Sequence, residues 1–463
     1  MPTRAKIYIG AVFVAGAASL SASVMNGFSP RFSIWALYLV FAIVASLVKL
    51  RLPGLMGTYS LSCLCFLFGF GRFPLAEILV VACAGAVVQS VCNTKDRPTV
   101  VQVLFNMANV TLSIAVCSLV LRVLSTSGLD TYRPAVMALV ACAYFAINTV
   151  VVSGILSLLN GKPLAEVCRE WYVWSFPYYL VGAAIVGLIP LSGQPLRAEA
   201  WLVVLPLGYL VHFFLGLREL RPSVRVNPGT TNESLPRQAM LYVLGVLVAG
   251  LILLFWAALQ WQSQDPLRFA CYLALAGAAA TLKVRLPGMR STISMNFVLL
   301  LVAIAALSLP EAVLMATLVG IIQCIWKPKK PPTAIRTLFN GACLSLSTAI
   351  AYMVCNWAAR AWLSNSLFGL VTLATLVLYS CNTFLVATVL SLVESRPLLH
   401  VWQNCYFWSF PYYLVGSAAA GLMTATCRSA GWQASLLVLP MTGLVYLTYR
   451  LHVSHFESAV WGS

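Results

Sequence analysis

The sequence predicts an all-α protein: a polytopic helical membrane protein built from two tandem, parallel-topology repeats of about eight membrane spans each. Three observations lead to this prediction. The chain of 463 residues is 61% hydrophobic and only 9% charged, whereas a soluble globular domain carries about 25% charged residues. Apolar runs of roughly 18–22 residues recur along the chain, and a helix of that length crosses a bilayer core of about 30 Å. Sequence landmarks also return at a constant offset, which indicates a duplication.

The duplication is clearest in two aromatic segments. YVWSFPYYLVG begins at Tyr172, and YFWSFPYYLVG begins at Tyr406, 234 residues later. The same offset relates KLRLPG at 49–54 to KVRLPG at 283–288, LFN at 104–106 to LFN at 338–340, and Asn-Thr at 148–149 to Asn-Thr at 382–383. Because the offset does not change, no net insertion or deletion separates these landmarks.

The only long polar stretch of the chain lies near its middle. It reads RPSVRVNPGTTNESLP and runs from 221 to 236. Proline, glycine, serine and threonine in such a stretch are typical of a linker. We therefore predict a first membrane repeat over 1–221, a cytoplasmic linker over 222–236 and a second membrane repeat over 237–463.

The apolar runs predict the individual spans. In the first repeat they cover about 7–25, 33–50, 57–72, 74–92, 99–122, 133–158, 172–191 and 199–217. In the second they cover about 241–261, 267–282, 291–308, 310–326, 333–356, 367–393, 406–424 and 433–451. The third and fourth spans are short, so they either cross fully or form a re-entrant hairpin together. The first run has no convincing small-residue cleavage site and is read as a retained span.

Lysine and arginine are distributed unevenly between the loops. With the N-terminus inside, the inner loops of the first repeat carry Lys49, Arg51, Lys95, Arg97, Lys162, Arg169, Arg218, Arg221 and Arg225, and the outer loops carry Arg31, Arg72, Arg133 and Arg197. The positive-inside rule then places both termini in the cytoplasm. An even number of spans orients both repeats alike, about a pseudo-two-fold axis along the membrane normal.

The formal net charge of +17 favours contact with lipid. The basic residues are scattered over short loops and form no basic domain, so we expect no nucleic acid as a partner. Cations on the cytoplasmic face attract anionic lipid headgroups. Membrane lipids are therefore the expected partners of these residues.

The sequence gives little support for catalysis, a metal or a cofactor. Membrane hydrolases and transferases need clustered acids, histidines or a nucleophile beside a base, but the twelve acidic residues lie mainly in loops or at span ends. The fourteen cysteines include no CxxC pair with zinc spacing. Glu77 and Glu311 form the one equivalent acidic pair, and both are predicted at helix starts, where a carboxylate is favourable. We predict no enzyme activity, no metal and no cofactor.

Two basic corners are retained at the offset. The first contains Lys49 and Arg51, and the second contains Lys283 and Arg285; each is followed by a Pro-Gly pair and two hydroxyl residues. Cations, a turn and hydroxyls that open a helix predict a site for phosphate or carboxylate, assisted by helix-start amides. The structural alternative is a helix stop, a turn and an N-cap with lipid-facing cations.

A second retained set consists of amides in the predicted fourth, fifth and sixth spans. They are Gln89, Asn106 and Asn148 in the first repeat, and Gln323, Asn340 and Asn382 in the second. Amides in hydrocarbon need partners, so they are expected to face inwards and to hydrogen-bond between helices. Lining a ligand site is the alternative role.

The duplicated aromatic segment predicts membrane anchoring. An amphipathic approach, KPLAEVCREW or RPLLHVWQNC, precedes it. Trp174 and Tyr178, like Trp408 and Tyr412, are expected in the aromatic belt at the interface. Tyr178 and Tyr412 are also candidates to border a ligand pocket.

The run RLPG-x(2)-G-T-x-S, followed by Glu77, Gln89, LFN and WSFPYYLVG, resembles the polytopic membrane domains that precede diguanylate-cyclase or HD-type phosphohydrolase outputs in some bacteria. The resemblance covers each repeat almost fully. It implies a bacterial inner-membrane unit that senses a signal and passes it to an output. This chain differs in having two such units and no output domain, so a separate signalling partner is expected to supply that step.

Three functions remain open on the sequence. The first is a non-enzymatic, sensor-type membrane protein that binds a small or lipid-like ligand. The second is a transporter whose substrate path lies at the interface of two parallel repeats. The third is a membrane enzyme acting on lipid. The absence of acidic and basic residues from mid-membrane positions disfavours a proton-coupled pump.

Overall fold

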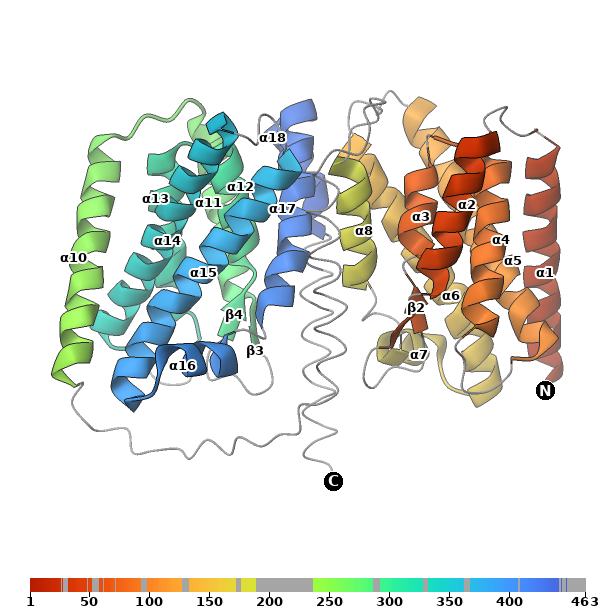
Figure 1. Cartoon of the computed structure of the whole chain (residues 1–463), viewed down its shortest axis with the longest axis horizontal. Coiled ribbons are helices and arrows are strands. Elements are labelled where there is room, and N and C mark those ends of the chain that lie inside the picture. Colours follow the sequence, from red (N-terminus) through yellow and green to blue (C-terminus); the bar gives the residue numbers. More distant parts are fainter. Residues whose placement is uncertain are drawn as a thin grey trace. The chain divides into compact units, whose positions relative to one another are not determined.

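The computed structural model describes a helical protein that divides into two compact units (Figure 1). The described residues are 1–25, 27, 32–47, 49–51, 58–60, 62–70, 72–92, 98–126, 133–171, 176–188, 236–285, 292–327, 332–361, 367–406, 409–440, 443 and 447. Helices α1 to α8 belong to the first unit, and helices α10 to α18 belong to the second. The predicted linker, apart from Pro236, lies outside the described residues.

The first unit contains eight helices and one hairpin in its described part. They are α1 (Thr3–Val24), α2 (Phe32–Leu47), β1 (Lys49–Arg51), β2 (Thr58–Ser60), α3 (Ser62–Gly69), α4 (Leu75–Val91), α5 (Val100–Thr126), α6 (Arg133–Asn160), α7 (Leu164–Trp171) and α8 (Phe176–Leu188).

The described part of the second unit repeats this order. It contains α10 (Arg237–Leu259), α11 (Pro266–Thr281), β3 (Lys283–Arg285), β4 (Thr292–Ser294), α12 (Asn296–Ala306), α13 (Leu309–Ile325), α14 (Ala334–Ala361), α15 (Leu367–Glu394), α16 (Leu398–Cys405) and α17 (Phe410–Ala430). The short helix α18 (Trp432–Ser435) and a 3₁₀ turn, η4 (Leu436–Val438), follow.

Six of the described helices are long and apolar enough to cross a membrane. They are α1, α5 and α6 in the first unit and α10, α14 and α15 in the second, with 22 to 28 residues each. Since a helix rises about 1.5 Å per residue, each reaches the 30 Å of a bilayer core. The helical fold and the membrane character are confirmed, whereas eight spans per repeat remain a prediction.

The third predicted span of each repeat is not one continuous helix. Residues 57–72 and 291–308 were expected as spans, but each region contains a strand followed by a short helix, α3 or α12. The strands β2 and β4 pair antiparallel with β1 and β3, with Lys49 opposite Ser60 and Lys283 opposite Ser294. The β-branched threonines and the intervening Pro-Gly favour a hairpin there. Because apolar residues follow directly, the whole region resembles a single membrane span in the sequence.

The end of each unit that carries the hairpin also carries a short amphipathic helix. In Figure 1, β2 and α7 lie at the lower end of the first unit, and β3, β4 and α16 lie at the lower end of the second. Helices α7 and α16 coincide with the amphipathic approaches predicted before the aromatic segments. We call this the hairpin end of each unit.

Other boundaries differ at the aromatic segments. Helices α8 and α17 begin at Phe176 and Phe410, four residues later than predicted. The predicted span 199–217 lies outside the described residues. Of the predicted span 433–451, the described part contains α18, η4 and the helical residues 439, 440, 443 and 447.

The first helix of each unit, α1 or α10, packs closely against α5 or α14. A Cβ atom added to Gly16 on α1 would lie 2.8 Å from the Cα atom of Ala108 on α5. A Cβ atom added to Gly250 on α10 would lie 2.5 Å from the Cβ atom of Ala342 on α14. Small residues let helix backbones approach in this way in membranes. The two contacts are 234 residues apart, so the offset that relates the sequences also relates the packing.

Candidate functional site

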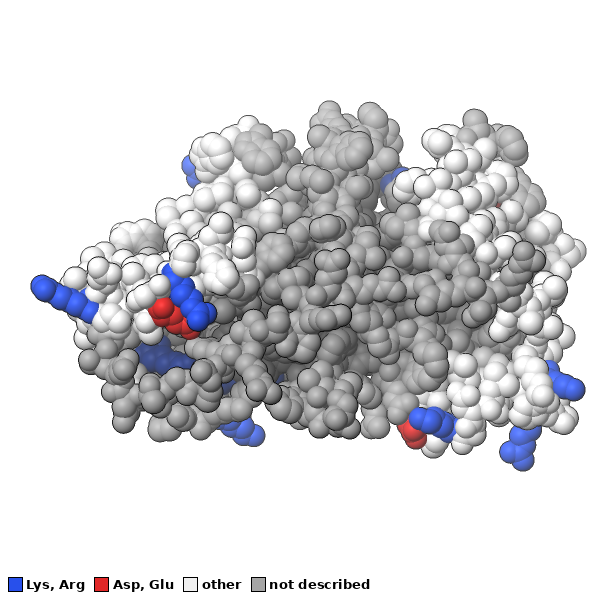
Figure 2. Space-filling model, turned by 60° about the horizontal axis from the view of Figure 1, so that its bottom comes forward, with Lys and Arg blue, Asp and Glu red and all other residues white. Residues whose placement is uncertain are grey.

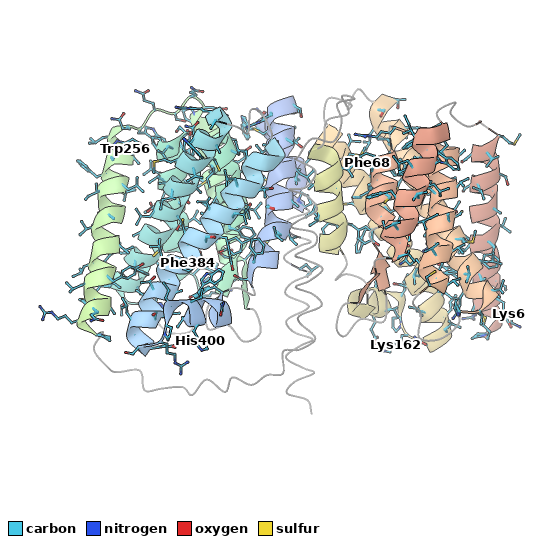
Figure 3. The ribbon with its side chains drawn as sticks, in the orientation of Figure 1. Lys6, Phe68, Lys162, Trp256, Phe384 and His400 are labelled. Carbon is cyan, nitrogen blue, oxygen red and sulfur yellow. The ribbon has the colours of Figure 1, made fainter. Side chains whose placement is uncertain are left out.

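Cationic side chains gather at the hairpin end of each unit. Figure 3 shows Lys6 and Lys162 at this end of the first unit and Phe68 at the opposite end. In the second unit His400 lies at the hairpin end and Trp256 lies at the opposite end. In Figure 2, where the hairpin end comes forward, most of the visible lysine and arginine side chains lie on the front and lower parts of each unit, and others lie at its upper edge. Helices α7 and α16 and the two hairpins therefore lie in a basic environment, which favours the binding of anionic groups.

The two predicted basic corners are strand residues. Lys49 and Arg51 lie on β1, and Lys283 and Arg285 lie on β3. Both hairpins have the same register, so each cation lies opposite a hydroxyl residue of the partner strand. The side chains of Lys49, Arg51 and Arg285 lie outside the described part of the structure, which leaves Lys283 as the corner cation with defined contacts.

Lys283 binds the end of a helix. Its Nζ donates a hydrogen bond to the carbonyl oxygen of Trp326, the C-cap of α13. A cation at this position pairs with an unsatisfied carbonyl and with the negative end of the helix dipole. Partial burial lowers the pKa of Lys283. The structural alternative to an anion corner thus has direct support at Lys283, although two of its three ammonium donors remain for other partners.

Gln323 connects the second hairpin to α13. Its Oε1 accepts a hydrogen bond of 3.0 Å from Asn296 Nδ2, and Asn296 Oδ1 accepts one of 2.7 Å from Ser294 Oγ. Ser294 is the last residue of β4, and Asn296 is the first of α12. Both of these residues are buried. The chain of polar contacts therefore fixes the hairpin, α12 and α13 relative to one another.

Asn340 binds the same part of α13 from α14. Its Nδ2 donates to the carbonyl oxygen of Gly320 at 2.8 Å, and its side chain also hydrogen-bonds the thiol of Cys324. The absence of a side chain at Gly320 allows this approach, because a Cβ there would lie 2.9 Å from the Cα atom of Gly341. Asn340 therefore makes hydrogen bonds between α14 and α13, as predicted for this amide.

The last turns of α13 therefore collect polar groups from three elements. Lys283 and Arg336 both lie close enough to Cys324 to act on it electrostatically. Neither cation forms an ion pair with a carboxylate; the ion pairs of the described residues are Lys162–Glu166 and Arg396–Glu394. We call this group the α13 terminal cluster: Lys283, Asn296, Gln323, Cys324, Arg336 and Asn340.

The first unit lacks part of this cluster. Asn106 Nδ2 donates to Ser90 Oγ at 3.0 Å, and Ser90 stands where the second unit has Cys324. Gln102 stands where the second unit has Arg336, and its side chain caps the start of α5 by accepting from the Thr99 amide at 2.8 Å. Gln89 is a partly exposed residue of α4. The equivalent positions of the first unit therefore lack the cation that Arg336 supplies in the second.

The third amide pair lies deeper and binds tyrosine. In the first unit Asn148 Nδ2 donates to the Tyr179 hydroxyl at 3.5 Å, and in the second the side chains of Asn382 and Tyr413 hydrogen-bond each other. Asn148 also accepts a hydrogen bond of 2.7 Å from Asn109 Nδ2. These contacts join α6 to α8 in the first unit and α15 to α17 in the second.

The aromatic segments pack inside their units. Tyr412 is 2% exposed, donates its hydroxyl to Met295 Sδ at 2.6 Å and packs against Phe297 with the ring centroids 5.0 Å apart. The prediction of an interfacial position was therefore wrong for Tyr412, because α17 turns this face towards α12. The side chain of Tyr178, and all of Trp174 and Trp408, lie outside the described part.

The duplicated motif instead encodes a repeated aromatic contact. Phe145 packs on Phe176 and Tyr179 with centroid distances of 5.3 and 5.5 Å. At the equivalent positions Tyr379 packs on Phe410 and Tyr413 at 5.1 and 5.0 Å. Ring pairs at these distances contribute about 0.5–1.5 kcal/mol beyond their area. The retention of the motif in both halves is thus explained by internal packing.

The acidic pair has a structural role in the second unit. Glu311 forms a capping box with Ser308 at the start of α13 and also accepts a hydrogen bond of 2.6 Å from Ser263 Oγ. The predicted helix-start role is confirmed there. Glu77 lies buried in the first turn of α4. The N-cap residue of this helix is Pro74, so no side-chain hydrogen bond caps it. Within the described residues, no group of three His, Cys, Asp or Glu side chains is placed to hold a metal ion.

Sequence reasoning missed Arg336, Asn296 and the tyrosine partners Tyr179 and Tyr413. Arg336 and Asn296 have no counterpart of the same type in the first repeat, so a search for retained residues passes over them. Tyr179 and Tyr413 are retained, but they follow directly after the tyrosines that were singled out. The rotation of α8 and α17 about their axes decides which member of each pair faces the amide.

Comparison with known proteins identifies one family. The MASE9 model, which describes a membrane-associated sensory-type domain, matches residues 267–423. The match runs from α11 into α17 and includes the whole α13 terminal cluster. No curated protein and no solved structure matches the chain.

Proposed function

We propose that the protein is a non-enzymatic membrane sensor that binds a small or lipid-like ligand carrying an anionic group. The observation that carries the proposal is the match of a membrane sensory family to residues 267–423, the segment in which the α13 terminal cluster lies. The plasma membrane of a bacterium is the proposed location, with both termini and the hairpin ends in the cytoplasm. The uneven distribution of lysine and arginine supports that orientation.

Two cations without a carboxylate partner support an anionic ligand. Lys283 and Arg336 approach Cys324 from β3 and α14 without a carboxylate partner. Phosphate and carboxylate bind strongly to such pairs because charge-assisted hydrogen bonds are about twice as strong as neutral ones. The amides of Gln323 and Asn340 are held beside them by their own bonds to Asn296 and to the Gly320 carbonyl. A ligand therefore meets charges on a prearranged polar surface.

Signal transfer is proposed to follow from the same contacts. The cluster joins the hairpin, α13 and α14, so an anion that draws Lys283 from the Trp326 carbonyl would loosen the end of α13. A separate partner on the cytoplasmic side is proposed to read this change. The resemblance to domains that precede signalling outputs supports the need for such a partner.

The experiment is ligand-dependent thermal stabilisation of the full chain in nanodiscs. We expect phosphatidylglycerol discs, compared with phosphatidylcholine discs, or added inorganic phosphate, to raise the unfolding midpoint. Arg336→Gln, which introduces the first-unit residue, should weaken the anion effect about tenfold, equivalent to about 1.4 kcal/mol. Arg360→Gln at the other end of α14 is the matched control and should retain it. Equal responses of both variants would contradict the proposed site.

The response to lipid and to phosphate distinguishes the two sources of the anion. Stabilisation by phosphatidylglycerol alone identifies a lipid headgroup, and stabilisation by phosphate in neutral discs identifies a soluble ligand. Flux of an anion across proteoliposomes would instead favour the transporter that the sequence leaves open. Chemical conversion of a bound lipid would favour the membrane enzyme.

A further inference from the structure

The core of the first unit contains a polar atom that the proposed function does not use. Asn109 lies on α5 with 3% of its surface exposed, and its Oδ1 has no hydrogen-bond partner. Its Nδ2 donates to Asn148 Oδ1 at 2.7 Å, and Asn148 Nδ2 donates in turn to Tyr179 at 3.5 Å. The amide nitrogen of Asn109 is therefore engaged, and its oxygen is a buried acceptor without a donor.

Rotating the amides does not remove this unpaired atom. If the Asn109 amide alone is turned over, its oxygen faces the oxygen of Asn148. If both amides are turned over, Asn148 donates to Asn109 and accepts from Tyr179, and the unpaired atom becomes Asn109 Nδ2. Buried polar groups in folded proteins are paired with protein, water or a ligand. The position of Asn109 therefore indicates a missing partner in either arrangement. In the arrangement that the structure has, the unpaired atom is the acceptor Oδ1, so the missing partner is a hydrogen-bond donor.

The second unit shows that helix packing does not require this amide. Cys343 occupies the equivalent position on α14 and is fully buried, while the contact between Asn382 and Tyr413 is retained. A buried thiol behaves as a small hydrophobic group. The interhelical amide–tyrosine bond is thus common to both units, and the additional acceptor belongs to the first unit alone.

We propose that Asn109 Oδ1 binds the hydroxyl group of a membrane-soluble alcohol, and that Asn148 and Tyr179 hold the amide in place. The site goes beyond the anion site of the second unit, because it lies in the other unit and selects a neutral donor. A charged ammonium is disfavoured, since burying a charge without a paired carboxylate costs far more than burying a hydroxyl that is hydrogen-bonded.

The surroundings suit the hydrocarbon part of such a ligand. Phe105 lies one turn before Asn109 on α5 and is buried in an apolar cluster with Ile9, Val12, Val151 and Ile155. One turn after Asn109, Ser113 Oγ is already bonded to the Asn109 carbonyl at 2.8 Å. The side-chain oxygen of Asn109 is therefore the free acceptor on this stretch of α5, at the edge of an apolar region.

The test compares hexanol with its isomer butyl ethyl ether, which has the same atoms but no O–H donor. We expect hexanol to raise the unfolding midpoint of the full chain in nanodiscs by about 2–4 °C relative to the ether at equal concentration. Asn109→Leu should abolish the difference. Asn109→Cys, which introduces the residue that the second unit tolerates, should do the same and guards against misfolding of the leucine variant.

The converse substitution provides the matched control. Cys343→Asn places an amide beside Asn382 and Tyr413, and the preference for hexanol over the ether should increase. A wild-type protein without this preference, as expected if water alone fills the site, would overturn the proposal. So would a preference that persists in Asn109→Cys. Loss of the anion response through Arg336→Gln is a separate readout, so failure of either site is recognised independently.

Discussion

The phenolic hydroxyl of Tyr242 donates a hydrogen bond to the carbonyl oxygen of Leu385, 3.2 Å away. The bond joins α10 to α15 across 143 positions of the chain. In the first unit Tyr8 on α1 donates to the Val151 carbonyl on α6 at 3.1 Å, across the same separation. In the most apolar stretch of α1, and likewise of α10, only 22% of the residues are buried inside the protein. The tyrosine bond therefore adds a second attachment, to α6 or α15, for a helix that packs closely on α5 or α14.

Replacing Tyr242 by phenylalanine should loosen α10. The ring stays in place, but the hydrogen bond is lost, so we expect the free energy of unfolding to fall by about 0.5–1.5 kcal/mol. Thermal unfolding in nanodiscs measures the loss. Tyr8→Phe should have a similar effect on the first unit. No change at either position would show that the two bonds do not stabilise their helices.

Two glycines of α10 should respond oppositely to alanine. Gly250→Ala places a methyl group 2.5 Å from the Ala342 Cβ atom and should cost about 1–3 kcal/mol, because the helices must move apart. Gly245→Ala meets nothing within 4 Å and should be neutral or stabilising by up to about 1 kcal/mol through helix propensity. Unfolding midpoints of the two variants test the close approach of α10 and α14. Similar midpoints would contradict it.

The equivalent amides Asn340 and Asn106 should not be equally important. Asn340 is partly buried and donates to the Gly320 backbone, whereas Asn106 is exposed and donates to the Ser90 hydroxyl. Asn340→Leu should therefore cost about 1–2 kcal/mol, and Asn106→Leu about 0.5 kcal/mol or less. Chemical or thermal unfolding measures both. A larger loss at Asn106 would reverse the expected order.

Trp402 should anchor α16 to the second unit. Its ring lies parallel to Phe384 with the centroids 4.9 Å apart, and its Nε1 donates to Thr383 Oγ1 at 2.9 Å. Trp402→Phe keeps the aromatic contact and should cost about 0.5–1.5 kcal/mol; Trp402→Ala also removes the stack and should cost about 3 kcal/mol or more. Protease sensitivity at α16 should rise in the same order. Equal sensitivity of both variants would exclude anchoring by the ring.

Helices with long apolar runs were predictable from the sequence. The boundaries of α10 and α15 lie within about four residues of the predicted spans, because apolar length and flanking polar residues define such helices locally. Helices α7 and α16 were likewise recognisable from their amphipathic pattern. The order of elements in the second unit followed from the repeat once the first had been read.

The hairpins and the polar contacts were not predictable in the same way. Pairing of Lys283 with Ser294 depends on a register set across a turn, and three-residue strands leave no period in the sequence. The choice between Tyr412 and Tyr413 as the partner of Asn382 depends on the rotation of α17 about its axis, because neighbouring residues of a helix point about 100° apart. Arg336 was found only when α14 was placed beside α13.

The conversion from strand to helix between Ser294 and Asn296 bears on how the second unit adapts to bilayers of different thickness. A strand residue advances about 3.3 Å and a helical residue about 1.5 Å, so each residue that changes state alters the length of this segment by about 1.8 Å. Helix α12, with 11 residues, is too short to span hydrocarbon alone. We expect hydrophobic mismatch to act first on this segment, and the uninterrupted helices beside it to respond by tilting.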